Sequence, residues 1–298
     1  MKSIIKRGIL GVAQHSKLVT KLAAFITHSS VGEKNTKDTY GYLRERFIKN
    51  GDNHAIDSSK REELVKSFER IHASVPMGST PTDGLILAEI LMNLDAEGDF
   101  IECGCYAGGS SAKLSLVAKL LDRKLLVFDS FEGLPAVDQY NLKDQHCRRD
   151  SNWVTDWTEG RYAARMDEVQ HNIEKYGDVS RCSFVKGWFS DTLTSDNLPN
   201  QIAFAFADVD LANSARDCFT ALWPILSDRG VYVTHDTAYI KVLLEIYNPK
   251  LWRDQFKSIP PVLFGAGFGV CNDSPHIGYM VKEESPNPDY LKSLTIDK

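Results

Sequence analysis

The sequence of 298 residues lacks several features that would place it in a common class. Its six cysteines contain no CxxC pair, so the usual spacing of a zinc site or a redox dithiol is missing. No apolar run approaches the roughly 20 residues that span a bilayer. An excess of basic residues is also missing, because the net charge is −5. We therefore expect free thiols in a reducing cytoplasm, no stable membrane insertion and no nucleic-acid partner.

The first 80 residues have a helical character. Met1–Phe25 contains five basic residues and no acid, with apolar positions at near-helical spacing. This pattern predicts an amphipathic helix that packs on the protein body; a membrane-surface helix or an oligomer contact is the alternative. Lys60–Ile71 shows a clear apolar face, and Thr80 is an N-cap signal for the helix that follows. We expect residues 1–80 to be a helical extension that serves as a lid or an oligomer contact in a homo-oligomer.

Apolar, β-rich runs alternate with helical patterns from Asp99 onward. Near-continuous apolar strands separated by helices are typical of a parallel sheet covered on both faces. The end differs, because Val262–Cys271 and His276–Val281 follow each other without a helix and predict a hairpin. Residues 81–298 are therefore expected to form a Rossmann-like α/β domain, a doubly wound seven-stranded sheet with an antiparallel C-terminal hairpin. The strands are expected at 100–101, 125–128, 182–185, 202–207 and 230–234, and the helices at 110–121, 161–176, 214–226 and 240–247.

A glycine-rich turn follows the first expected strand and opens a helix. Its pattern is Glu102-x-Gly104-x-x-x-Gly108-Gly109-Ser110. Glycines let the backbone approach a ligand closely, and the helix N-terminus favours a carboxylate or phosphate. The spacing does not fit the G-x-G-x-x-G of dinucleotide sites. It suits S-adenosylmethionine, whose ammonium would face Glu102 and whose carboxylate would face backbone N–H groups; simple turn chemistry is the alternative.

The next strand ends at Asp129 and breaks at once into a turn. Consecutive strands of a parallel sheet present their carboxyl ends on one edge, where nucleoside cofactors bind. An ionised carboxylate there accepts hydrogen bonds from both vicinal ribose hydroxyls. Asp129 is therefore the candidate for the ribose, and a cap for the turn at 130–133 is the alternative.

Several unusual motifs resemble the macrocin O-methyltransferase family. They are Asp129-Ser-Phe-Glu-Gly-Leu-Pro135, Tyr176-Gly, Lys186-Gly-Trp-Phe-Ser-Asp-Thr-Leu193, Asp208-x-Asp210 and Trp223-Pro-Ile-Leu-Ser227. The resemblance runs roughly from 84 to 247. It implies the class I methyltransferase fold, S-adenosyl-L-methionine as cofactor, and a hydroxyl acceptor, usually a sugar, as in natural product or glycan modification. It also implies a divalent metal, most often Mg²⁺.

The same resemblance assigns roles to individual residues. The methionine end of the cofactor would be lined by Glu102, Gly104 and Gly108, with Ser110 opening the helix. Asp129 would hold the ribose, and Ser130 and Trp188 would lie near the adenine. Asp208 and Asp236 would hold the metal, with Asp208 also facing the acceptor.

His235 departs from the family, which typically has a second aspartate there. An imidazole would lower the affinity for Mg²⁺ and favour Mn²⁺, Fe²⁺ or Zn²⁺. Alternatively, His235 is a general base beside Asp208, or only a strand-end histidine bonded to backbone. The aromatic and charged segment 138–165 also departs from the family and is expected to be either a lid over the acceptor or a surface excursion.

These observations favour an S-adenosylmethionine-dependent O-methyltransferase that acts on a sugar or glycosylated small molecule, with Asp208 and His235 as catalytic residues. One alternative is a nicotinamide-dependent oxidoreductase, against which the glycine spacing and the terminal hairpin count. The other is a methyltransferase-fold protein that binds cofactor without turning over an acceptor.

Overall fold

The computed structural model describes residues 39–136, 157–265 and 276–283. The basic helix predicted within residues 1–25, most of the 138–165 segment and the centre of the predicted hairpin lie outside these residues. Within them, none of the helices is long and apolar enough to cross a membrane.

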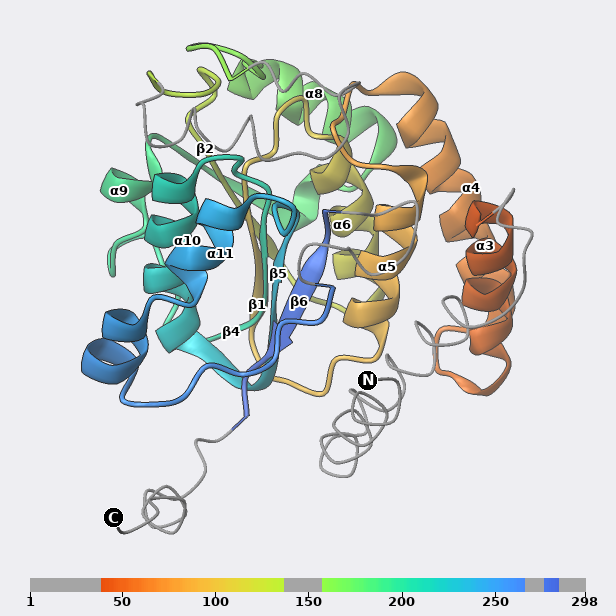
Figure 1. Ribbon diagram of the computed structural model, residues 1–298. Coiled ribbons are helices and arrows are strands. Elements are labelled where there is room, and N and C mark those ends of the chain that lie inside the picture. The colour runs from red at the N-terminus through yellow and green to blue at the C-terminus, as the bar shows by residue number, and fades with distance from the viewer. Residues whose placement is uncertain (1–38, 137–156, 266–275, 284–298) are drawn as a thin grey trace, which may run out of the picture.

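A six-stranded sheet forms the centre of the described structure, with strand order β3-β2-β1-β4-β5-β6 (Figure 1). β1 to β5 are parallel, and β6 pairs antiparallel with β5. The chain leaves β3 at one edge and crosses to β4 beside β1, which creates the switch point where α/β proteins bind ligands. The strands are β1 Asp99–Cys103, β2 Leu125–Asp129, β3 Cys182–Lys186, β4 Ile202–Ala207, β5 Leu226–Thr234 and β6 Gly278–Val281.

Backbone hydrogen bonds continue across the carboxyl edge of the parallel strands. The amide of Gly104 donates to Phe128 at 2.9 Å, and Gly187 donates to Asp129 at 3.0 Å. On the other side, Asp208 donates to the carbonyl of Cys103 and His235 to that of Ala207, both at 2.9 Å. The first residues after β3, β1, β4 and β5 are therefore held in one row with the end of β2.

Helices cover both faces of the sheet (Figure 1). One face packs against the helices that precede and follow β1 and β2, and the other against those around β4 and β5, so two apolar cores form. The first group is α3 Thr39–Lys49, α4 Ser58–Ser74, α5 Pro81–Met92, α6 Gly109–Leu120 and α8 Met166–Tyr176. The second is α9 Phe189–Thr192, α10 Ala212–Ile225, α11 Ile240–Ile246 and the π-helix η4 Leu251–Phe256. Short 3-10 helices lie at Asn50–Asn53 and Val179–Arg181.

The described part of the N-terminal extension shares a core with the sheet domain. Leu43 and Phe47 of α3 and Phe68 of α4 belong to the same apolar cluster as α5 and α6. A buried ion pair joins the two parts, because Arg61 Nη1 of α4 lies 2.7 Å from Glu89 Oε2 of α5. Arg61 is fully buried, so this contact lies inside the core.

Two predictions of the sequence analysis are corrected. The sheet has six strands rather than seven in the described residues, and β6 has only an isolated antiparallel bridge, Phe264 to Tyr279, where a further strand was expected. Pro260 and Pro261 lie just before this bridge and have no N–H for a ladder. The helix expected from Arg161 begins at Met166 instead, since Tyr162 has a positive φ of 59°.

Candidate active site

The glycine turn after β1 leaves no room for a side chain. Gly104 has φ +85°, and a Cβ there would lie 2.0 Å from the carbonyl oxygen of Asp208. Gly108, with φ +84°, is the N-cap of α6 and brings no side chain to bond the first amides of the helix. Glycine at these two positions therefore lets the turn pack directly on the end of β4 while α6 starts with uncapped N–H groups.

Glu102 is buried beneath this turn. Its Oε2 accepts a hydrogen bond from Ser111 at 2.5 Å, whereas Oε1 is buried without a partner in the described residues. Burial raises the pKa of Glu102 to about 8, since the hydroxyl contacts offset only part of the lost hydration. Glu102 thus carries an unsatisfied acceptor that a cationic group would satisfy.

Asp129 ends β2 and braces two turns. Its Oδ2 accepts from the amide of Cys105 at 2.8 Å, and its Oδ1 accepts from the amide of Phe131 at 2.7 Å. The turn cap that the sequence analysis gave as the alternative is therefore present. A carboxylate has about four acceptor positions, so two of them remain for hydroxyl groups.

The two residues predicted near the adenine differ in their freedom. Ser130 is buried, donates to the carbonyl of Gly133 at 2.8 Å and accepts from the amide of Glu132 at 3.1 Å, so its hydroxyl belongs to the turn. Trp188 follows β3 as the N-cap of α9 and is 39% exposed. Its ring is therefore the freer of the two for contact with a ligand.

A second cluster forms where β4 and β5 end. His235 Nδ1 lies 3.3 Å from Asp208 Oδ1, and its Nε2 lies 3.3 Å from Asp83 Oδ2 at the start of α5. Burial alone would lower the pKa of His235, but the two carboxylates outweigh it and raise that pKa well above the ordinary value. The imidazole is thus held as a cation between two carboxylates.

Asp236 lies next to this pair and is buried. Its Oδ2 accepts from the amides of Val209 and Asp210, each at 3.0 Å. Burial and the nearby Asp208 raise the pKa of Asp236 to about 7, and burial together with Asp236 also raises that of Asp210. Asp208, His235 and Asp236 each offer a ligand atom within 4.8 Å of the others.

Two further acids, Asp83 and Asp210, belong to this cluster and were not among the predicted site residues. Asp83 forms a capping box with Thr80, so its sequence signal is that of an ordinary helix start. Asp210 belongs to the Asp208-x-Asp210 motif, so the sequence did contain a signal that could have pointed to it. The residues that were predicted for the site fall into two neighbouring groups. One group lies around Glu102 and Asp129, and the other around Asp208 and His235.

Comparisons with known proteins identify the family and the fold of the chain. The profile of the macrocin-O-methyltransferase (TylF) family matches residues 83–254. Among solved structures, the O-methyltransferase NovP is 21% identical, with 90% of this chain and 98% of NovP covered and a TM-score of 0.50. The calicheamicin methyltransferase CalS11 is 18% identical, with 84% and 94% covered and a TM-score of 0.50. No curated protein matches the chain. The structural likeness shows the methyltransferase fold, and because the family profile matches more than half of the sequence, the chain belongs to the macrocin O-methyltransferase family.

Proposed function

We propose that the protein transfers a methyl group from S-adenosylmethionine to a hydroxyl of a sugar-containing small molecule. The observation that carries this proposal is the row at the carboxyl edge of the sheet. Asp129 and the end of β1, where Glu102 lies, are beside Asp208 and His235 in this row, so a donor group and an acceptor group would have adjacent places. Membership of the family supports methyl transfer as the reaction. The resemblance to the family also implies that the acceptor contains a sugar.

On the donor side, each residue would meet one part of the cofactor. The unsatisfied Oε1 of Glu102 would accept from the ammonium group, and the uncapped amides of α6 would face the carboxylate. Asp129 would accept from the ribose hydroxyls with its two remaining acceptor positions. Trp188 would lie against the adenine ring.

On the acceptor side, Asp208 is the base that we propose. The paired imidazolium of His235 has no free acceptor nitrogen, whereas the side chain of Asp208 is 24% exposed. In the transfer, the hydroxyl oxygen bonds to the methyl carbon as the carbon–sulfur bond breaks, which converts the sulfonium to a thioether. Asp208 takes the hydroxyl proton, and His235 orients Asp208 for this step.

The cluster also fits a divalent cation, which the family resemblance implies. Once His235 gives up one ring proton, Asp208, His235 and Asp236 supply two carboxylates and an imidazole. The raised pKa of Asp236 reflects buried negative charge that a cation would relieve. Such a donor set favours Mn²⁺, Fe²⁺ or Zn²⁺ over Mg²⁺. When bound, the ion would lower the pKa of the acceptor hydroxyl.

Calorimetry with S-adenosylhomocysteine and with NADH tests the donor assignment. The wild type is expected to bind S-adenosylhomocysteine and not NADH, and Asp129→Ala is expected to abolish that binding. Asp254→Ala, which removes an exposed aspartate paired with Arg253, is the matched control. Binding of NADH instead, or full affinity in Asp129→Ala, would refute the assignment.

Turnover of a panel of sugar-containing hydroxyl compounds, before and after treatment with EDTA, tests the acceptor side. Loss of turnover that Mn²⁺ restores is expected if the cluster holds a metal. Turnover that survives EDTA would show that Asp208 and His235 act without a metal ion. Cofactor binding with no turnover of any acceptor would favour the non-catalytic alternative.

A further inference from the structure

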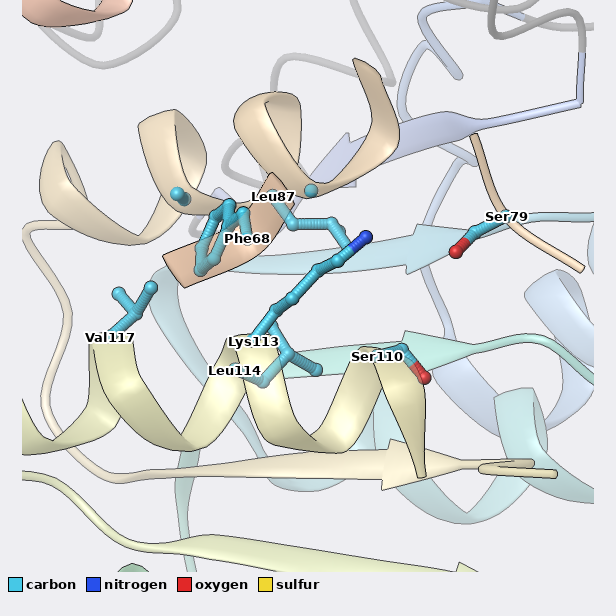
Figure 2. A pocket seen from close by; sticks show the side chains of 9 residues that line it. Phe68, Ser79, Leu87, Ser110, Lys113, Leu114 and Val117 are labelled. Atoms are coloured by element: carbon cyan, nitrogen blue, oxygen red, sulfur yellow. The ribbon is translucent and has the colours of Figure 1, made fainter. Parts of the chain in front are cut away.

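Lys113 is a charged residue inside the core beside the glycine turn. It lies in the second turn of α6, and only 3% of its surface is exposed. Its side chain lines a small pocket between α4, α5 and α6, together with Ser79, Ser110, Gly84 and five apolar residues (Figure 2). A lysine is rarely buried to this extent unless an anion compensates its charge.

No carboxylate of the described residues lies within ion-pair distance of this ammonium group. Its contact is the thioether of Met77, with Nζ 3.3 Å from Sδ, which is a weak acceptor. Burial lowers the pKa of Lys113 to about 8, and the more distant Asp83 offsets only part of that effect. The protein therefore buries a cation without giving it a full partner of its own.

The hydroxyl groups of the pocket gather at the same end as the ammonium group. Figure 2 shows the stem of Lys113 running along the pocket, with its nitrogen toward the end where Ser79 and Ser110 lie and away from Val117. Ser110 is three residues before Lys113 and so lies on the same side of α6. The Ser110 hydroxyl also contacts Glu102, so the cation, the Ser79 hydroxyl and the uncapped start of the helix are the groups that form a site for an oxyanion.

We infer that Lys113 and Ser79, with Ser110 between this pocket and Glu102, form a carboxylate subsite that holds the amino-acid end of the methyl donor. The inference rests on the proposed function and adds an ion pair to it. Glu102, on the strand below α6, has a buried oxygen without a partner. A bound ammonium group would hold Glu102 in its ionised form on one side, and Lys113 is a cation on the other. The two sides then match the opposite charges of an α-amino carboxylate, which makes the donor a better candidate than a carboxylate or phosphate on the acceptor.

Two ligands separate this subsite from the rest of the donor site. S-Adenosylhomocysteine carries the amino-acid group, whereas 5′-methylthioadenosine has the same nucleoside and lacks it. By calorimetry, Lys113→Met should bind S-adenosylhomocysteine about 10 to 100 times more weakly than the wild type, as expected for a lost charge-assisted contact. Its affinity for 5′-methylthioadenosine should stay unchanged.

A purely structural lysine would behave differently in the ligand-free protein. Methionine fills a similar volume without a buried charge, so Lys113→Met should unfold at a higher temperature than the wild type. Lys119→Met is the matched control, because this lysine of the same helix is 60% exposed and pairs with Asp178. If Lys113→Met does not fold, Lys113→Gln provides the same comparison.

Equal affinity of wild type and Lys113→Met for S-adenosylhomocysteine would refute the subsite. A loss of affinity for both ligands would also refute it, because the effect would then not depend on the carboxylate. If S-adenosylhomocysteine binding is unchanged but KM for the acceptor rises, or inorganic phosphate alone protects the wild type from unfolding, the anion has another source and the inference is wrong. A wild type that binds neither nucleoside contradicts the proposed function itself.

Discussion

The ion pair between Arg61 and Glu89 gives a prediction about how the helices before residue 80 are joined to the sheet domain. Arg61 is fully buried, and besides Glu89 it donates to the carbonyl oxygens of Phe47 at 3.0 Å and Ile56 at 3.1 Å. Arg61→Met would keep most of the apolar stem and remove all of these bonds. It would leave the carboxylate of Glu89 buried without its cation.

Breaking a buried pair by removing one partner costs about 3 to 5 kcal/mol of the free energy of unfolding. At about 2 °C per kcal/mol, the low end expected for larger domains, Tm should fall by about 6 to 10 °C. The loss should appear as one transition in thermal and urea unfolding, because α3 and α4 belong to the same core as α5 and α6.

A second variant separates the charge effect from lost packing. In Arg61→Met combined with Glu89→Gln, the buried charge is gone, and the amides of Asn50 and Asn93 still have an acceptor. Most of the lost stability should return. Arg44→Met removes the partly exposed pair with Glu69 and should cost less than about 1 kcal/mol. A Tm of Arg61→Met equal to that of Arg44→Met, or separate melting of the N-terminal helices, would refute the reasoning.

Three further predictions concern the site. Burial raises the pKa of Glu102 from 4.5 to about 8, so the free energy of unfolding of the ligand-free protein should fall by up to about 5 kcal/mol as pH rises through this range. If the urea midpoint of Glu102→Gln changed with pH as steeply as that of the wild type, this prediction would be contradicted. His235→Asp should shift the metal that restores EDTA-treated enzyme from Mn²⁺ toward Mg²⁺, and an unchanged metal profile would show that the residue at this position is no ligand. Gly104→Ala would place a Cβ 2.0 Å from the Asp208 carbonyl, so affinity for S-adenosylhomocysteine should fall by at least about tenfold; unchanged affinity in calorimetry would show that the turn adapts.

The parallel sheet could be predicted well from the sequence because its strands are short and apolar, and the central strands β1 and β4 are almost fully buried. β4 was predicted with its observed bounds, Ile202–Ala207. β5 was expected to start at Gly230 but begins at Leu226, since the exposed Asp228 and Arg229 hide the start of the strand. The count of seven strands was wrong for the described residues: of the strand expected at 262–271, they contain only the bridge at Phe264, which follows Pro260 and Pro261.

The candidate site was partly predictable for a related reason. Asp129 ends a strand, and Asp208 and His235 each follow one. Parallel topology brings strand ends together whatever their separation in sequence. Asp83 is 152 residues from His235, and its capping-box pattern is complete without any ligand or histidine. Lys113 lies on a helix whose sequence does not reveal that α4 and α5 cover it. Such contacts depend on how helices pack, which local patterns do not encode.

The close approach of Gly104 to the carbonyl of Asp208 has a consequence for the order of events in the site. The turn that would receive the donor and the loop that would receive the acceptor have no free space between them, so displacement of one must displace the other. Binding of the two substrates should therefore be energetically coupled. Such coupling is reciprocal: if the bound donor changes the affinity for the acceptor by some factor, the bound acceptor changes the affinity for the donor by the same factor.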